Sequence, residues 1–151
     1  MAEYETNIED TETVSLREIV LSAWEMVDTD GAELQIQDSK ELEAESTRLQ
    51  QLFENLFANA TNHGPDDVTI QVGTTDTGFY IEDTGPGIPK ERREKVFEAG
   101  YTTESGNTGF GLNIVRQIVV GHGWEITVTD GENGGARFEI SGPTFQPEIY
   151  N

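Results

Sequence analysis

Hydrophobic residues recur along this chain with two periods, one typical of helices and one typical of strands. Three stretches have the helical spacing of a core-facing stripe: about 15–28, about 46–63 and about 109–120. Five stretches alternate between apolar and polar residues as strands do: 32–37, 68–72, 78–83, 125–129 and 136–140. The last four strands form two hairpins. The pattern therefore predicts an α+β fold, a two-layer sandwich of about three helices on one face of a mixed, mostly antiparallel five-stranded sheet.

Local signals mark the ends of several of these elements. Ser15-Leu16-Arg17-Glu18 reads as a capping box at the start of the first helix. Gly64-Pro65 ends the second helix, and Gly121 with Gly123 ends the third. The segment 84–108 is rich in Gly and Pro and carries a short charged stretch, so we expect a long functional loop with a little helix inside.

A chain of 151 residues suits a single domain. We expect a flexible lead-in or linker end over 1–13, one domain over 14–142 and a short tail over 143–151. The chain has no Cys and only two His, which excludes disulfides and disfavours a structural zinc site. It has no basic leader and no apolar run near ~18 residues, so the prediction is a cytoplasmic domain without direct membrane contact.

The charge of the chain changes the range of partners that it can have. Nine Lys and Arg stand against 29 Asp and Glu, a formal net charge of -20. This balance excludes the basic footprint of a general nucleic-acid binder. Leu, Ile, Val and Phe are together 36 of the 151 residues, enough to bury a core. Acidity with little Lys is typical of halophilic proteins, including those of haloarchaea, because concentrated salt screens self-repulsion. Our hypothesis for this surface is a salt-loaded cytoplasm.

Three amide side chains occupy one flank of the second predicted helix. On the helical wheel, Asn55, Asn59 and Asn62 fall close together at the edge of the apolar stripe that contains Leu49. A partly desolvated amide oxygen there suits a metal ion or a metal-bound water, although such amides also commonly meet solvent or a loop. His63 falls inside the stripe, and a packed or capping role is the simpler interpretation.

Two glycine-rich segments add further chemistry. Asp83-Thr84-Gly85-Pro86-Gly87-Ile88-Pro89 follows a strand directly, which offers a fixed acceptor for an amino group beside backbone that a flat ligand can approach. Gly106 to Leu112 leads into a helix, where backbone amides can bind an anion without Lys or Arg. Each alone could be an ordinary turn or connector. In this order and at this spacing along the chain, Asn59, Asp83 and Gly109 together indicate a magnesium-nucleotide site.

At this point the sequence resembles the catalytic ATP-binding domain of sensor histidine kinases, within the superfamily of gyrase, heat-shock chaperone and mismatch-repair ATPases. The resemblance covers about 14–142. Gln51 to Ala60 resembles the family's asparagine box, and Asp83 to Pro89 resembles its first glycine box. Val96 to Thr103 resembles its phenylalanine box, and Thr108 to Leu112 resembles its second glycine box.

The resemblance implies roles for these residues. Asn59 would bind Mg²⁺ with the help of Asn55, and both would be catalytic. Asp83 would accept the amino group of adenine, and residues 90–108 would form a mobile ATP lid. The residues implied in binding ATP are Asn59, Asn62, Asp83, Gly85, Gly87, Ile88, Tyr101, Thr102, Thr103, Thr108, Gly109, Phe110, Gly111 and Leu112.

Asn55 separates the kinases from the hydrolases of this superfamily. The hydrolases have a Glu there that activates water, and an amide cannot accept a proton from water at neutral pH. The resemblance thus favours transfer of the γ-phosphoryl of Mg-ATP to a histidine. Neither His63 nor His122 resembles the family's phosphoacceptor, so that histidine would lie on a dimerisation segment outside these residues, with a response regulator downstream. The alternatives are a nucleotide-binding regulatory module without chemistry and, disfavoured by Asn55, a gyrase-type ATPase.

Overall fold

The computed structural model describes residues 11–27, 31–63, 67–85, 87–88, 90–93, 95, 110–131 and 134–143. The helices are α1 (Leu16–Met26), α2 (Ser46–His63) and α3 (Phe110–Gly121), with a short 3-10 helix, η1 (Lys90–Arg92). The strands are β1 (Glu12–Ser15), β2 (Glu33–Ile36), β3 (Glu41–Ala44), β4 (Thr69–Thr74), β5 (Gly78–Asp83), β6 (Glu125–Asp130) and β7 (Ala136–Ser141).

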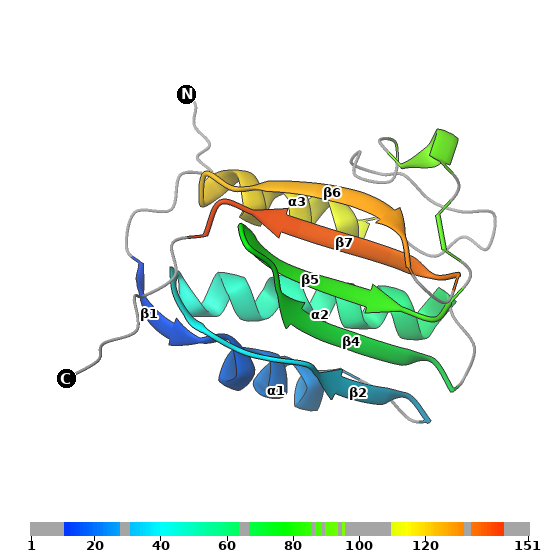
Figure 1. Ribbon diagram of the computed structural model, residues 1–151, viewed down its shortest axis with the longest axis horizontal. Helices are drawn as coiled ribbons and strands as arrows, with labels where there is room; N and C mark the ends of the chain where they lie inside the picture. Colours follow the sequence, from blue (N-terminus) through cyan, green and yellow to red (C-terminus); the bar gives the residue numbers. More distant parts are fainter. Residues whose placement is uncertain are drawn as a thin grey trace.

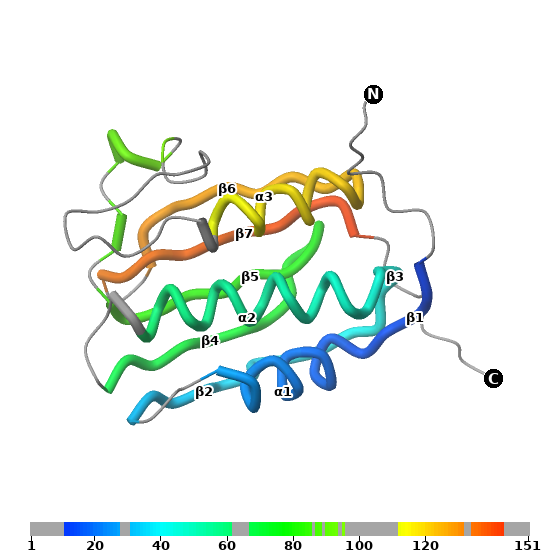
Figure 2. The backbone as a smooth tube through the Cα atoms, turned by 180° about the vertical axis from the view of Figure 1, so that it is seen from behind, coloured from blue at the N-terminus to red at the C-terminus, as the bar shows by residue number. Residues whose placement is uncertain are grey.

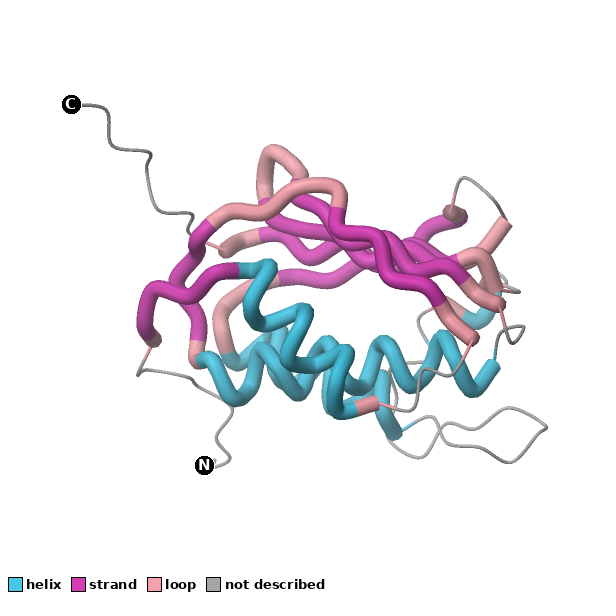
Figure 3. Tube along the Cα trace, turned by 90° about the horizontal axis from the view of Figure 1, so that it is seen from below, coloured by secondary structure: helices cyan, strands magenta, loops and turns pink. Residues whose placement is uncertain are grey.

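The main sheet has five strands in the order β2-β4-β5-β7-β6 (Figure 1). β2 pairs with β4 in parallel, and every other neighbouring pair is antiparallel. The helices α1, α2 and α3 lie together on one face of this sheet, which Figure 3 shows as two separate layers. The predicted α+β two-layer sandwich with a mixed sheet is therefore confirmed.

The structure also contains a small second sheet that the sequence pattern did not predict. β1 and β3 pair antiparallel, from Glu12 opposite Ala44 to Ser15 opposite Glu41. Each strand is four residues long, too short for alternation to distinguish it from a loop or a helix start. Val14, Leu42 and Ala44 are buried in the main core. This sheet thereby joins the start of α1 to the start of α2.

The predicted start of α1 and end of α3 are present in the structure. The Ser15 hydroxyl accepts a hydrogen bond from the backbone N–H of Glu18 at 3.3 Å, as an N-cap does. After α3, Gly123 has φ +82°, and the Trp124 N–H donates to the Val119 carbonyl. A left-handed glycine of this kind satisfies the last carbonyls of a helix. Capping residues therefore fix these two helix ends, which periodicity alone leaves open.

A chain of aromatic rings crosses the core between the two layers. Phe53 of α2 lies 5.8 Å from Phe57 and 5.5 Å from Phe79 of β5, measured between ring centroids. Phe57 in turn meets Trp24 of α1 at 5.2 Å, and Phe79 meets Trp124 at 6.1 Å. Both of these outer contacts are edge-to-face, the arrangement that ring quadrupoles prefer. These rings hold α2 on the sheet and so set where its amide side chains lie.

His122 connects the end of α3 to the start of α2. Its Nε2 accepts a hydrogen bond from the backbone N–H of Glu45 at 3.1 Å, and its Nδ1 lies 2.8 Å from the Ile118 carbonyl. The ring stacks on Trp124 at 4.1 Å. Because Nε2 must accept and Nδ1 must donate, the neutral imidazole fits this site. The histidine is a structural link between two helices, and both of its ring nitrogens are engaged.

This link predicts a loss of stability in mild acid. Burial lowers the pKa of His122 below its ordinary value, against the opposing effect of its contact with the Ile118 carbonyl. A lowered pKa means that the unfolded chain takes up the proton first, so stability is complete above about pH 6.5 and falls as the pH decreases below that value. Urea unfolding at several pH values should show this fall. His122→Gln keeps an acceptor, and its stability should lack this component of the pH dependence. An identical profile in the variant would contradict the assignment.

None of the helices in the described ranges is both long enough and apolar enough to cross a bilayer.

Candidate functional site

Four elements bring their ends together at one edge of the molecule (Figures 1 and 2). The C-terminal half of α2 lies there beside the end of β5, the start of β7 and the start of α3. β5 and β7 are paired neighbours in the sheet, and α2 packs against α3. The segments that carry Asn59, Asp83 and Gly111 are thus gathered in space although they are far apart in the sequence.

The α2 part of this site consists of two half-buried amide side chains. Asn55 and Asn59 are four residues apart and so lie on one face of the helix. The Nδ2 atom of Asn55 is buried, and no described residue accepts a hydrogen bond from it. A buried amide donor without an acceptor is costly, so this atom is suited to an oxygen-rich ligand or an ordered water. The neighbouring Glu54 carboxylate is bound elsewhere, since it accepts a 2.8 Å hydrogen bond from Gln50.

The β5 part of the site is the carboxylate of Asp83. Its Oδ1 accepts two backbone hydrogen bonds, from Gly85 at 2.8 Å and from Ala136 at 3.3 Å. Within the described ranges no group hydrogen-bonds Oδ2. Burial raises the pKa of Asp83, with a smaller contribution from Glu82, while the two backbone donors oppose the rise. One oxygen is therefore fixed by the backbone, and the other remains able to accept a hydrogen bond in a half-buried site.

Two glycines allow backbone segments to meet closely around Asp83. A Cβ on Gly135 would lie 1.9 Å from the Asp83 carbonyl oxygen, a contact that no side chain can make. Gly87 has φ +79°, and a Cβ there would lie 2.9 Å from the Gly134 carbonyl oxygen. Gly135 and Ala136 were not predicted as site residues. The Gly134-Gly135 pair at the start of a strand was the local signal, and it reads equally well as a hairpin turn.

The remaining predicted site residues lie in or against the core, at the start of α3 or outside the described residues. Leu112 is 4% exposed and belongs to the hydrophobic core, and Ile88 is half-buried against that core. Either could meet a ligand only through its backbone or the edge of its side chain. Phe110 and Gly111 begin α3. The residues 101–109 and the side chains of Asn62 and His63 lie outside the described part of the chain, as does most of the predicted lid.

The described start of the predicted lid is fastened to the sheet. Arg93 donates from Nε to the Ile88 carbonyl at 3.1 Å and from a terminal nitrogen to Asp130 Oδ1 at 2.6 Å. Asp130 ends β6, so one arginine links the first glycine-rich turn to the far strand of the sheet. An exposed ion pair of this kind contributes little to stability, and its effect is to orient the root of the segment.

A separate groove of about 680 Å³ lies between α3 and β6. Its walls include Lys90, Arg93 and Arg116 together with apolar residues such as Trp124 and Ile126. Of the predicted nucleotide-binding residues that the structure describes, none lines it. The groove is thus distinct from the site around Asp83.

Comparison with known proteins identifies the family of this chain. Residues 44–146 match the family described as histidine kinase-, DNA gyrase B- and HSP90-like ATPases. The matched range contains α2, the main sheet apart from β2, and every site residue discussed above. The chain belongs to this family.

Within this family, the chain is similar to sensor proteins and sensor histidine kinases. The chain is 38% identical over 102 residues to the sensor protein CitS of Halalkalibacterium halodurans, a match that covers 64% of this chain and 19% of that protein. It is 31% identical over 141 residues to the sensor histidine kinase ZraS of Salmonella typhimurium, with 85% of this chain and 30% of the relative covered. The chain thus spans only about a fifth to a third of the length of these relatives.

Solved structures of histidine kinases have the same fold. A mycobacterial sensor histidine kinase, MprB, superimposes with a TM-score of 0.74 at 26% identity, over 92% of this chain and 100% of the other. The catalytic domain of histidine kinase ThkA also gives a TM-score of 0.74 at 26% identity, over 90% and 97%. Taken with the family match, these likenesses identify the chain as an ATP-binding catalytic domain of the sensor histidine kinase kind.

Proposed function

We propose that this domain binds Mg-ATP and transfers the γ-phosphoryl group to a histidine on a dimerisation segment. The observation that carries the nucleotide part of the proposal is the state of Asp83, with Oδ1 held by two backbone donors and Oδ2 available. A fixed, half-buried carboxylate oxygen beside glycine backbone suits the exocyclic amino group of adenine. Gly85, Gly87 and Ile88 would line the base, and Tyr101, Thr102 and Thr103 would contribute from the lid.

The polar residues on α2 fit a phosphate-bound magnesium ion. The side-chain oxygen of Asn59 would bind Mg²⁺ with Asn55 assisting, because amide oxygens are suitable ligands for this hard cation. Asn62 would contact the nucleotide. The orphaned donor of Asn55 supports this assignment, since a triphosphate supplies the acceptor oxygens that the protein lacks there. Bound Mg²⁺ would neutralise charge on the phosphates. In a chain of net charge -20, this bridging role is needed for a polyanion to bind at all.

The start of α3 would complete the phosphate site. Phe110, Gly111 and Leu112 are the first residues of α3, and Thr108 and Gly109 precede them in the sequence. The first N–H groups of a helix have no acceptor within the helix and can bind an anion. These donors carry no formal charge and need no lysine. They would therefore hold the phosphates without the cationic side chains in which this chain is poor.

The residues on α2 favour transfer over hydrolysis. Asn55 stands where a water-activating carboxylate would be needed, and Glu54 is hydrogen-bonded to Gln50. In the transfer reaction the imidazole nitrogen of the acceptor attacks the γ-phosphorus, the bond to the β–γ bridging oxygen breaks, and ADP leaves. The residues of this chain would position the triphosphate and help to neutralise its charge, because phosphoryl transfer requires little covalent catalysis by the protein.

The wider setting is also part of the proposal. The catalytic domain would span 14–142 and act as the cytoplasmic portion of a larger sensor, with a response regulator as the downstream partner. The acidic surface would suit a salt-rich, halophilic cytoplasm, in which short-range screening removes much of the self-repulsion.

The proposal predicts magnesium-dependent nucleotide binding followed by transfer. Calorimetry with a non-hydrolysable ATP analogue should show binding that requires Mg²⁺, at a salt concentration where circular dichroism shows the fold intact. Adding the dimerisation segment of the same sensor and γ-labelled ATP should then place acid-labile label on that segment.

Variants separate the possible outcomes. Asn59→Ala should abolish both binding and transfer, whereas Gln117→Ala, an exposed amide on α3, should leave both unchanged. Absence of magnesium-dependent binding would overturn the proposal. Binding without transfer would instead indicate a regulatory module, and steady phosphate release that depends on Asn59 would indicate an ATPase.

A further inference from the structure

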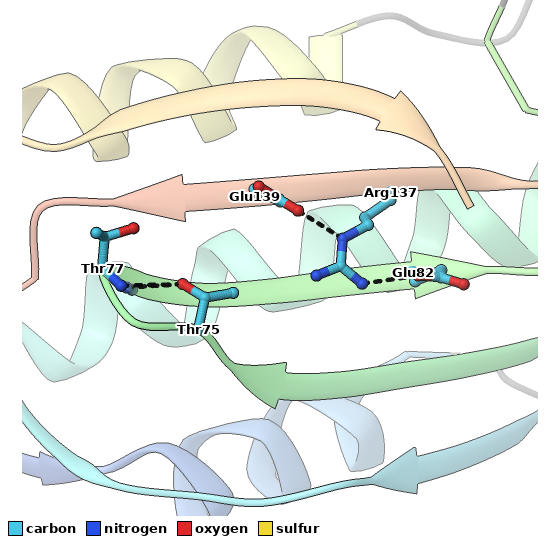
Figure 4. A network of polar contacts seen from close by, with 6 residues as sticks. Thr75, Thr77, Glu82, Arg137 and Glu139 are labelled. Carbon is cyan, nitrogen blue, oxygen red and sulfur yellow. Dashed lines mark hydrogen bonds and ion pairs between the residues drawn. The ribbon is translucent and has the colours of Figure 1, made fainter. Parts of the chain in front are cut away.

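An ion pair between a buried Glu82 and a half-buried Arg137 lies on the outer face of the sheet, next to Asp83 in the sequence of β5 (Figure 4). Glu82 precedes Asp83 in β5, and Arg137 follows Ala136 in β7; the two are opposite each other in the antiparallel register. An Arg137 terminal nitrogen donates to Glu82 Oε1 at 2.9 Å. Glu82 is only 5% exposed and is the one buried charged residue in the described ranges. Such burial of a carboxylate is unusual unless it is paired.

The arginine is held from three sides. Besides Glu82, its Nε donates to Glu139 Oε2 at 2.7 Å, and its guanidinium lies 4.0 Å from the centroid of the Tyr80 ring. Gly131 covers Glu82 closely, since a Cβ there would lie 3.0 Å from the Glu82 Cγ. The pair is therefore fixed in one geometry by β5, β7 and the turn after β6.

Stability alone gives a weak reason for such a pair. The desolvation of two charges roughly cancels their attraction, and apolar residues of similar size often serve as well. The carboxylate of Glu82 also opposes the ionisation of Asp83, whose pKa it helps to raise. A negative charge next to the residue that must accept a hydrogen bond is harmful unless it is neutralised.

The pairing of Glu82 with Arg137 affects Asp83 through the register of two strands. Side chains alternate between the two faces of a strand, so Glu82 and Asp83 point to opposite faces. A slip of one residue between β5 and β7 would reverse this arrangement. The same register brings the Ala136 N–H to Asp83 Oδ1 and allows Gly135 to pass the Asp83 carbonyl.

We propose that Arg137 is a positioning residue for recognition of the nucleotide base, acting through Glu82 and Ala136. It neutralises the carboxylate beside Asp83 and keeps the start of β7 in the register that anchors Asp83 Oδ1. This inference rests on the proposed function only in assigning the base to Asp83; the coupling between Arg137 and Asp83 is a property of the free chain.

The first test measures that coupling without nucleotide. The pKa of the Asp83 carboxyl, followed by carbon NMR, should rise in Arg137→Gln, because Glu82 then acts on Asp83 unneutralised. In Glu82→Gln the pKa should fall. The described charged groups at this end of the sheet are Glu82, Arg137, Glu139 and the Arg93–Asp130 pair, whose Asp130 lies opposite Ala136. Glu139→Gln is the matched control, since Glu139 binds the same guanidinium but is more exposed than Glu82. It should shift the Asp83 pKa far less. An Asp83 pKa that is unaltered in Arg137→Gln would overturn the inference.

The second test measures binding of the Mg-bound ATP analogue as a function of pH. Arg137→Gln should bind the analogue about tenfold more weakly than the wild type does. As the pH is lowered, its binding should also be lost at a higher pH than that of the wild type. Glu82→Gln should show the opposite displacement of the pH profile. If Arg137→Gln does not fold, the neutral pair Glu82→Gln/Arg137→Gln takes its place. Because both charges are then absent, its pH profile should lie close to that of the wild type and at higher pH than that of Glu82→Gln. Identical profiles for Glu82→Gln and the double variant would overturn the role of Arg137.

The two proposals fail in different ways. A wild-type chain that shows the coupling in the NMR titration but binds no nucleotide would overturn the proposed function and leave the positioning pair. Nucleotide binding in Arg137→Gln with the affinity and pH profile of the wild type would overturn the positioning role and leave the function. A loss of affinity in Arg137→Gln equal at all pH values would also count against it, because it would indicate structural damage alone.

Discussion

Replacing Asp83 with asparagine is expected to weaken binding of the ATP analogue by about ten- to a hundredfold. A hydrogen bond to a charged group contributes about 1.5–3 kcal/mol, and each 1.4 kcal/mol is a factor of about ten in affinity. The fold should survive, because the side-chain oxygen of asparagine can still accept from the Gly85 and Ala136 N–H groups. Isothermal titration calorimetry of the two proteins, with thermal unfolding alongside, measures both effects.

Base selectivity gives this prediction a second, independent readout. An asparagine NH₂ opposite the amino group of adenine is a donor facing a donor, whereas it matches the carbonyl of guanine. The ratio of ATP to GTP affinity should therefore fall in Asp83→Asn. The interpretation of Asp83 as the base acceptor would be wrong if the variant bound ATP within twofold of the wild type and kept its selectivity.

Replacing Phe53 with alanine is expected to cost about 3–5 kcal/mol of unfolding free energy. Phe53 is fully buried and occupies the middle of the aromatic chain, between Phe57 and Phe79. Its removal leaves a cavity between α2 and β5 that rigid neighbours cannot fill. Since domains of this size are stable by about 5–15 kcal/mol, the loss is a large part of the total. Urea unfolding at constant salt measures it.

The control for Phe53→Ala is a large apolar residue on the surface. Met26, at the end of α1, is 69% exposed, and Met26→Ala should change stability by no more than about 0.5 kcal/mol. A similar small change in Phe53→Ala would show that the aromatic chain is not the centre of the core. Nucleotide affinity should also decrease in the destabilised variant, because the positions of Asn55 and Asn59 depend on the packing of α2 against the sheet.

Much of the fold was accessible from local patterns. The apolar stripe from Leu49 to Ala60 has the period of a helix, and the runs around Ile70, Ile81 and Ile140 have the period of a strand. Caps such as Ser15 and Gly123 are equally local, since they satisfy backbone groups of adjacent residues. The order and spacing of the asparagine and glycine segments also indicated a nucleotide site. These signals can be read from the sequence because residues close together in the chain produce them.

The contacts that hold Asp83 in place could not be predicted from local patterns. The Ala136 N–H reaches Asp83 across 53 residues, and the close approach of Gly135 to the Asp83 backbone depends on the pairing of β5 with β7. Nothing in the local sequence distinguishes Glu82 or Arg137 from the other charged residues of an acidic chain. The pairing of two distant strands in register decided that Arg137 would meet Glu82 and that the Glu82 carboxylate would be buried.

The amino-acid sequence by itself thus determined the class of fold and the acidic composition of the chain, and it indicated the segments that we propose carry the chemistry. The tertiary structure alone decided which oxygen of Asp83 is held, which amide of α2 is left without a partner, and which charges are buried. The physical reason is the range of the interactions. Periodicity and capping act over a few residues, whereas desolvation and cross-strand hydrogen bonding arise only where packing brings distant segments into contact.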